Sequence, residues 1–221
     1  MSVRESYDAV AASYAEHIAD ELNGKPIDRA LYALFAALTG PGAHVADVGC
    51  GPGHVGAYLA GLGLEVVGID LSPGMISVAG RRFPDVRFRV GDMLATGGLG
   101  GDVFDGVVCP YSIVHFGADH RTAAFAELTR VIRPGGWLML AFHTTNESTE
   151  NLTHRDEWFG HAVDLDFQFI DPDEAISQLS AAGFELRSRT DRDPSGTEVP
   201  TRRTYLIARR TPTPAPTPTP S

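Results

Sequence analysis

The sequence predicts an α/β protein in which helices cover both faces of a mostly parallel sheet. Three observations support this fold class. Short apolar segments typical of buried strands alternate with segments of helical periodicity between residues 43 and 142. The first apolar segment enters a glycine-dense turn, residues 49–53, and acidic residues stand at the ends of the first two strand segments. Strands that alternate with helices in this way form a parallel sheet, because each helix returns the chain to the same edge.

Two helices are expected before the alternating region. The first, residues 3–22, has an apolar face formed by Val3, Tyr7, Val10, Tyr14 and Ile18. The second begins at Pro26, continues through Leu38 and ends at the glycine- and proline-containing turn 39–42.

The remaining elements follow from the same periodicities. The expected order is strand 43–48, helix 54–61, strand 65–69, helix 73–82, strands 86–90 and 104–108, helix 119–132 and strand 136–142. A further helix begins at Asp171, has Pro172 in its first turn, and runs to Ala182 before Gly183 ends it. Two final strands, about 184–190 and 202–208, flank the turn-rich segment 191–196.

Length and composition fit one α/β domain. The chain has 221 residues and a net charge of −10, which disfavours a nucleic-acid partner because such proteins neutralise phosphates with basic residues. No apolar run approaches the roughly 20 residues of a membrane span. The start lacks signal-peptide features, so a cytoplasmic location is expected. The two cysteines, Cys50 and Cys109, are too few for a disulfide scaffold and are expected to be reduced.

The last eleven residues, Thr211 to Ser221, alternate Thr with Pro and carry no apolar side chains for a core beyond one Ala. Because proline lacks the amide hydrogen that helices and central strands need, we expect this segment to be a disordered tail.

The turn after the first strand has the features of a cofactor loop. Gly49, Gly51 and Gly53 permit a sharp turn that brings main-chain N–H groups close to a ligand. Asp47 is expected at the carboxyl end of its strand, where open parallel sheets bind their ligands.

Two cofactor classes are compatible with this loop. Residues 51–56 spell G-x-G-x-x-G and Asp70 has the spacing of a ribose-binding acid, a pattern found with nicotinamide dinucleotides. A carboxylate at Asp47 would, however, repel a pyrophosphate. S-adenosylmethionine (SAM) has no phosphate, and its sulfonium and ammonium groups are cationic. The loop therefore favours SAM, with Asp70 on the ribose hydroxyls.

Five ordered segments resemble the class I SAM-dependent methyltransferases, namely residues 45–54, 66–76, 88–93, 104–109 and 128–140. The resemblance implies a Rossmann-like sheet of seven strands that is parallel except for an antiparallel last strand. It also implies that a helix before the first strand closes over the cofactor, so we expect residues 1–40 to be a helical lid on a methyltransferase domain formed by residues 41–210.

The same resemblance implies positions around the cofactor. Leu71 and Met75 would flank the adenine, Asp92 would lie near its amino group, and Met93 would lie beneath the ring. The complete set of expected cofactor-binding residues is Tyr14, Asp47, Gly49, Cys50, Gly51, Gly53, Asp70, Leu71, Met75, Asp92, Met93 and Cys109.

The acceptor is expected beside the segment 109–116, which leaves the fourth strand. Some amino-group methyltransferases carry here an acidic or amide residue followed by two prolines and an aromatic. The sequence Cys-Pro-Tyr-Ser at 109–112 departs from that pattern, which weakens the case for methylation of nucleic-acid or protein amines. His115 is the first candidate for a general base, His143 is the second, and Tyr111 is expected to line the acceptor pocket.

An insertion after the fifth strand, residues 143–168, is expected to form a mobile cap. Trp158 and Phe159 would cover an apolar acceptor there. The segment is rich in His and Asp, but no compact ligand pair such as H-E-x-x-H occurs, so we expect no metal.

The sequence therefore predicts SAM-dependent methylation of a small-molecule acceptor, because the expected elements include no separate domain for a large polymer. Oxygen is the atom that we expect to be methylated. Three alternatives stay open: N- or C-methylation of a small metabolite, an NAD-dependent oxidoreductase, and a SAM-binding protein without catalytic activity. The sequence leaves the oligomeric state open.

Overall fold

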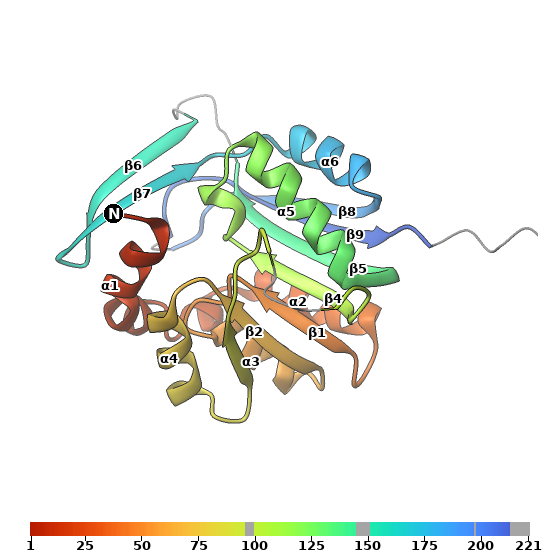
Figure 1. The fold of residues 1–221 in the computed structure, drawn as a ribbon, viewed down its shortest axis with the longest axis horizontal. Coiled ribbons are helices and arrows are strands. Elements are labelled where there is room, and N and C mark those ends of the chain that lie inside the picture. The colour runs from red at the N-terminus through yellow and green to blue at the C-terminus, as the bar shows by residue number, and fades with distance from the viewer. Residues whose placement is uncertain (96–99, 145–150, 197, 213–221) are drawn as a thin grey trace, which may run out of the picture.

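The computed structural model describes residues 1–95, 100–144, 151–196 and 198–212. Its centre is a seven-stranded sheet of order β3-β2-β1-β4-β5-β9-β8 (Figure 1). The strands are β1 (His44–Val48), β2 (Glu65–Asp70), β3 (Arg87–Val90), β4 (Phe104–Pro110), β5 (Ile132–His143), β8 (Phe184–Arg192) and β9 (Arg203–Arg210). The first five strands are parallel, whereas β9 lies antiparallel between β5 and β8. The predicted fold class is confirmed.

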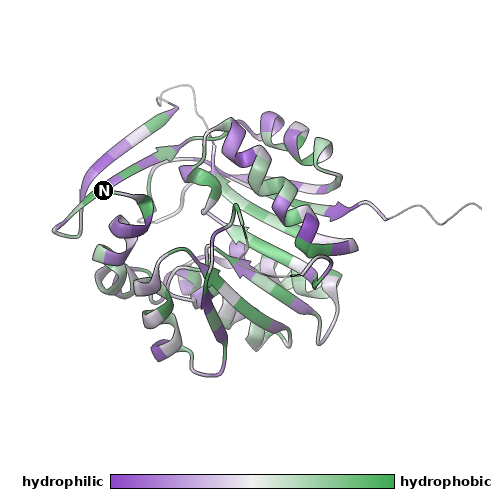
Figure 2. Cartoon of the chain, in the orientation of Figure 1, coloured by the Kyte–Doolittle hydropathy of each residue, from purple (hydrophilic) through white to green (hydrophobic). Residues whose placement is uncertain are grey.

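Helices cover both faces of this sheet. On one face, α2 (Pro26–Thr39) and α3 (His54–Gly61) pack against residues such as Val45 and Val108. On the other face, α5 (Ala118–Val131) and α6 (Pro172–Ala181) pack against residues such as Ala46 and Val107. Neighbouring strand residues thus enter opposite cores, as the alternation of a β-strand requires. Figure 2 shows the resulting hydrophobic character of the central strands.

The N-terminal helix α1 (Val3–His17) is shorter than predicted, and a 3₁₀ turn, η1 (Glu21–Gly24), follows it. Ser2 and Glu5 form a capping box at its start. The expectation that this helix continues to residue 22 is wrong. The chain turns after Ile18, and Glu21 is directed toward His54 and Lys25, at 2.7 Å from each.

The two N-terminal helices occupy different places. α1 packs on α4 (Pro73–Arg82), where the Asp8 carboxylate accepts hydrogen bonds from the Ser72 hydroxyl and the Gly74 amide. In contrast, Tyr32 and Phe35 of α2 are buried in the core against the sheet. The expected lid over residues 1–40 therefore describes α1, whereas α2 belongs to a helical layer of the domain.

The insertion after β5 contains a two-stranded antiparallel hairpin, β6 (Leu152–Trp158) and β7 (His161–Gln168), which lies beside α1 (Figure 1). The hairpin lies within the segment 143–168 that the sequence predicts to be a cap, and its mobility stays a prediction. Phe159 and Gly160 at its tip have φ values of 53° and 76°, which is the backbone pattern of a type I′ hairpin turn. Val163 and Leu165 of β7 are buried against α1.

Among the helices of the residues described, none has the length and apolar character needed to cross a bilayer. Of the expected Thr/Pro tail, residues 213–221 lie outside the described residues.

Candidate active site

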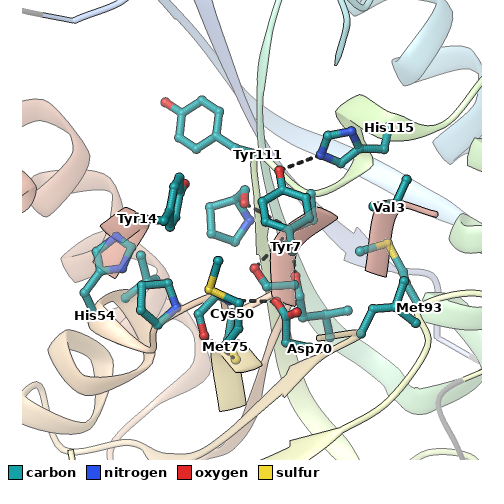
Figure 3. Close-up of a pocket in the computed structure, with 18 of the residues that line it drawn as sticks. Val3, Tyr7, Tyr14, Cys50, His54, Asp70, Met75, Met93, Tyr111 and His115 are labelled. Atoms are coloured by element: carbon teal, nitrogen blue, oxygen red, sulfur yellow. Dashed lines mark hydrogen bonds between the residues drawn. The ribbon is translucent and has the colours of Figure 1, made fainter. Parts of the chain in front are cut away.

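A cavity of about 390 Å³ opens at the carboxyl ends of β1 and β2, between the glycine loop and α1 (Figure 3). Its position agrees with the edge of a parallel sheet at which ligands bind. Residues from six parts of the chain line it: the start of the chain with α1 (2–14), the segments 18–32 and 48–55, and the segments 70–75, 91–94 and 110–116.

The loop glycines serve different purposes. A side chain at Gly49 would collide with the Ser112 hydroxyl at 2.1 Å, and one at Gly53 would collide with the Phe88 ring at 2.6 Å. Gly51 has φ of +51°, and the nearest atom to a Cβ placed there is 4.0 Å away on Tyr14. Gly49 and Gly51 line the cavity, whereas Gly53 does not, and the contact of Gly53 with the cofactor stays a prediction.

The amide hydrogens of this loop are already engaged within the protein. Gly49 and Cys50 both donate to the Ile69 carbonyl, at 2.7 and 3.1 Å. The Gly51 amide donates to the Asp70 carboxylate at 2.8 Å. The expectation that this turn presents its N–H groups to a ligand is therefore corrected, and the turn lacks the free donors that a pyrophosphate needs.

Asp70 lies at the end of β2 and lines the cavity as expected. Its two carboxylate oxygens accept hydrogen bonds from the amides of Gly51, at 2.8 Å, and Ser72, at 2.9 Å. Burial nevertheless raises the pKa of this carboxyl above its ordinary value, and the two amide bonds oppose the rise. Because a carboxylate has about four lone pairs, Asp70 can also accept hydrogen bonds from a ligand.

Asp47 is fully buried and is not among the residues that line the cavity. Its side chain lies beneath the first turn of α3, where a Cβ on Gly56 would be 3.2 Å from the Asp47 Oδ2 atom. Burial raises the pKa of Asp47 to about 7, and the Gly56 amide opposes part of that rise. The prediction that the Asp47 carboxylate faces the ligand is therefore wrong.

The expected adenine-binding residues meet at one side of the cavity. Leu71, Met75, Asp92 and Met93 all line it, and so does Cys50. Cys109, in contrast, is fully buried and directs its thiol toward the Met93 sulfur at 3.9 Å. The prediction that Cys109 contacts the cofactor is wrong, because its side chain faces the core beneath Met93 instead of the cavity.

His115 lines the cavity from the short 3₁₀ turn η2 (Ile113–His115). Its Nδ1 is 2.8 Å from the Asp166 carbonyl oxygen, and its Nε2 is 2.7 Å from the Tyr7 hydroxyl (Figure 3). A carbonyl only accepts, so Nδ1 carries the proton and Nε2 accepts from Tyr7. Burial lowers the pKa of His115, which favours this neutral form.

Aromatic side chains of α1 and the hairpin contact one another at the first cavity. Tyr14 lines it, as predicted, and its ring is 5.1 Å from that of Trp158 and 6.3 Å from that of Tyr7. α1 and the hairpin thus meet through edge-to-face ring contacts, a favourable arrangement for aromatic pairs.

Sequence reasoning missed three residues here. Tyr7 was assigned only to the apolar face of a helix, because its partner His115 is 108 positions away. Glu21 and His54 form a pair at 2.7 Å, and both line the cavity. The Glu21 pKa is lowered to about 2 because hydrogen bonds and charge from His54 and Lys25 outweigh its burial. The position of His54 directly after the glycine turn was the sequence feature that could have identified it as a lining residue.

A second cavity, of about 1000 Å³, adjoins the first. Tyr7, Tyr14, Glu21 and Tyr111 line both, so these residues stand at the junction. The predicted acceptor residues Trp158 and Phe159 line the second cavity, together with Phe167 and Phe169.

His143 also lines the second cavity, not the first, so the structure separates it from His115. Its Nδ1 is 2.7 Å from the Thr201 hydroxyl oxygen. Burial, reinforced by the positive charges of Arg203 and Lys25, lowers the pKa of His143 to about 4. The ring is therefore neutral near pH 7.

Among the described residues, no group of three or more His, Cys, Asp or Glu side chains is arranged to hold a metal ion. A parallel sheet with a glycine loop after its first strand, an acid at the end of its second and a cavity closed by an N-terminal helix defines the class I SAM-dependent methyltransferase fold.

Comparisons with known proteins agree with this class. Residues 45–136 match the methyltransferase domain family. The chain is 39% identical over 160 residues to the O-methyltransferase cnsE of Penicillium expansum, a match that covers 68% of this chain and 55% of that protein. It is 38% identical over 101 residues to the demethylmenaquinone methyltransferase of Renibacterium salmoninarum, covering 46% and 41%. The chain belongs to the class I SAM-dependent methyltransferases.

The fold is also that of solved structures. The magnesium protoporphyrin IX methyltransferase of Synechocystis, crystallised with S-adenosylhomocysteine (SAH), superposes with a TM-score of 0.73 at 18% identity, covering 95% of this chain and 98% of that one. The chain spans about half the length of the curated relatives that it matches.

Proposed function

We propose that this protein binds SAM in the first cavity and transfers its methyl group to a hydroxyl oxygen of a small-molecule acceptor. The observation that carries the proposal is the neutral His115 beside the cavity, whose basic nitrogen is directed at the Tyr7 hydroxyl where the two cavities join.

The residues present fit SAM better than a dinucleotide. The apolar surfaces of Leu71, Met75 and Met93 suit an adenine ring, and Asp70 has lone pairs left for ribose hydroxyls. The loop amides of Gly49, Cys50 and Gly51 are used within the protein, which disfavours the pyrophosphate of NAD. SAM, when bound, supplies an electrophilic methyl group on a sulfonium.

In the reaction proposed, the chain provides a path for the acceptor proton. The acceptor hydroxyl donates to the Tyr7 oxygen while the Tyr7 proton moves to Nε2 of His115. SAM, held in the first cavity, would supply the methyl group to the acceptor oxygen, and His115 carries the acceptor proton as an imidazolium until it is released to water. The Asp166 carbonyl orients the ring throughout, because it accepts from Nδ1 in either protonation state.

The test uses SAM, 2-naphthol, 2-naphthylamine and the variants His115→Ala and His120→Ala, of which the second is the matched control because the exposed His120 lines neither cavity. We expect SAM to bind in the micromolar range and 2-naphthol to be methylated. His115→Ala should retain SAM affinity and lose about a hundredfold or more of turnover, whereas His120→Ala should retain turnover. Methylation of the amine alone, or equal turnover in His115→Ala, would contradict O-methylation through His115.

Two further outcomes identify the alternatives. Saturable binding of NAD without binding of SAM would replace the proposal with an oxidoreductase. Binding of SAM without methylation of any acceptor in a broad panel of alcohols, phenols, amines and thiols would indicate a non-catalytic SAM-binding protein.

We also infer a cytoplasmic location, since both cysteines are buried and unpaired, which is typical of a reducing compartment.

A further inference from the structure

The second cavity differs chemically from the first. Seven aromatic side chains line it: Tyr7, Tyr14, Tyr111, Trp158, Phe159, Phe167 and Phe169. They come from α1, the end of β4, the hairpin and the segment that follows it. Because such rings bury large flat surfaces and favour stacked or edge-to-face partners, a cavity of this kind selects flat aromatic ligands.

Two of these seven residues have a positive φ. Tyr111 has φ of 56°, a region that bulky side chains rarely adopt, and its hydroxyl bonds with that of Tyr205 at 2.8 Å. Phe159 has φ of 53° because it belongs to the type I′ turn of the hairpin, and its ring stacks on Trp158 with centroids 5.2 Å apart. The backbone conformation of Tyr111 is of the kind that clusters at functional sites.

The charges around this cavity disfavour an anionic ligand. Lys25 pairs with Glu21 at 2.7 Å, and both Lys25 and Arg203 lie 3.4 Å from Glu198. Arg155 lies over the Trp158 ring at 5.2 Å. A carboxylate or phosphate entering here would face the four acidic residues of the lining, Glu16, Asp20, Glu21 and Glu198.

A cationic ligand is disfavoured for a related reason. Arg155 on Trp158 and Lys25 on Tyr111, at 5.2 and 6.0 Å, are already within the range of cation–π contacts with two of the rings. A further cation would be repelled by both. The acidic residues Glu16 and Asp20 of the lining are exposed to solvent, where their attraction for a cation is screened. The aromatic interior therefore suits an uncharged ligand.

The cavity also provides polar contacts. At the junction with the first cavity stands the Tyr7 hydroxyl, hydrogen-bonded to His115. The neutral ring of His143, 5.1 Å from that of Tyr111, also lines the cavity, and its Nε2 bonds to none of the residues that the structure describes. A ligand can thus place a hydroxyl at Tyr7 and a second polar group at His143.

We propose that the second cavity is the acceptor site and that its acceptor is an uncharged, planar aromatic compound of more than one ring. Its reacting hydroxyl lies at Tyr7, and His143 can contact a second polar group. The inference rests on the proposed function for the identity of the first cavity.

The test measures binding, not turnover. The full chain, saturated with SAH, is titrated in a calorimeter with four probes of similar size: 2-naphthol, the saturated alcohol decahydro-2-naphthol, 2-naphthoate and 2-naphthylmethylammonium. We expect 2-naphthol to bind at least tenfold more tightly than each of the other three. Equal or tighter binding of the saturated alcohol would exclude selection by aromatic walls, and tighter binding of either ion would exclude an uncharged ligand.

Variants locate the site. Trp158→Ala should weaken 2-naphthol binding about tenfold or more, as loss of one ring contact and its buried area predicts, and leave SAH affinity unchanged. Trp137→Phe is the matched control, because Trp137 lies outside both cavities beside Arg209. Phe169→Leu is a milder second variant for the same wall and should also weaken 2-naphthol. Unchanged binding of 2-naphthol in both wall variants would overturn the inference.

The outcomes separate the two proposals. Failure of SAH to bind refutes the cofactor assignment. Binding of SAH together with no discrimination among the four probes refutes only the acceptor site.

Discussion

Asp47→Asn should stabilise the protein, and increasingly so at higher pH. The wild-type carboxyl is fully buried with its pKa raised from 3.8 to about 7. Below pH 3.8 it is neutral in the folded and unfolded states alike. As the pH rises toward 7, the unfolded state loses this proton first, so Asp47 progressively lowers the free energy of unfolding. At about 1.4 kcal/mol for each tenfold change in proton affinity, the buried charge costs about 4 kcal/mol above pH 7.

The amide of asparagine has nearly the same shape and cannot ionise, so it removes this cost. Urea unfolding followed by circular dichroism gives the free energy of unfolding for both proteins at about pH 5 and about pH 8. The advantage of the variant should be about 3 kcal/mol larger at the higher pH. Asp85→Asn, which removes a charge from an exposed turn, is the control and should show little pH dependence. A pH-independent difference between Asp47→Asn and wild type would refute the burial argument.

Three other predictions concern the two cavities. Asp70→Ala leaves the amides of Gly51 and Ser72 without their acceptor. Calorimetry should show SAH affinity reduced more than tenfold, and urea unfolding should show a free energy of unfolding lower by about 3 kcal/mol. Unchanged SAH affinity would contradict the role of Asp70. The His143 ring has its pKa lowered to about 4, so NMR should show no titration of this ring near pH 6.5. The free energy of unfolding should fall as the pH is lowered from 6.5 toward 4, because the unfolded state takes up the proton first. A ring that titrates near pH 6.5 would mean that His143 is not buried as described. Phe159→Ala removes the ring that stacks on Trp158 and should weaken 2-naphthol binding about tenfold with SAH affinity retained; equal loss of both would indicate collapse of the roof over the first cavity.

The central sheet could be predicted because each strand carries its own signal. Buried parallel strands such as β1 and β4 are short apolar runs followed by glycine or proline, and the turn after β1 is dense in glycine. These signals are local, so one sequence was enough to place them.

The hairpin could not be predicted in the same way. In β7 only Val163 and Leu165 are buried, and six of the seven residues of β6 are exposed, so the segment reads as a polar loop. What makes it a hairpin is its contact with α1, which is more than 130 positions away. The same limit applies to Tyr7, whose role depends on His115.

Side-chain direction was the other source of error. Residues 47 and 109 both stand near the ends of strands beside the cavity, but Asp47 is buried beneath α3 and Cys109 faces Met93. Because neighbouring side chains of a strand point to opposite faces, proximity in sequence to a cofactor loop does not decide which face a residue takes. The structure was needed to separate lining residues from supporting ones.

The acceptor for the Nδ1 proton of His115 is the main-chain oxygen of residue 166, not a side chain. Every amino acid supplies that oxygen, so the identity of residue 166 is free to vary without loss of the imidazole tautomer. The hairpin can therefore exchange its side chains to suit new acceptors during evolution while the chemistry at its base is preserved. Changes of loop length or strand register in β7, which would displace the oxygen itself, are the changes that such a lineage would not tolerate.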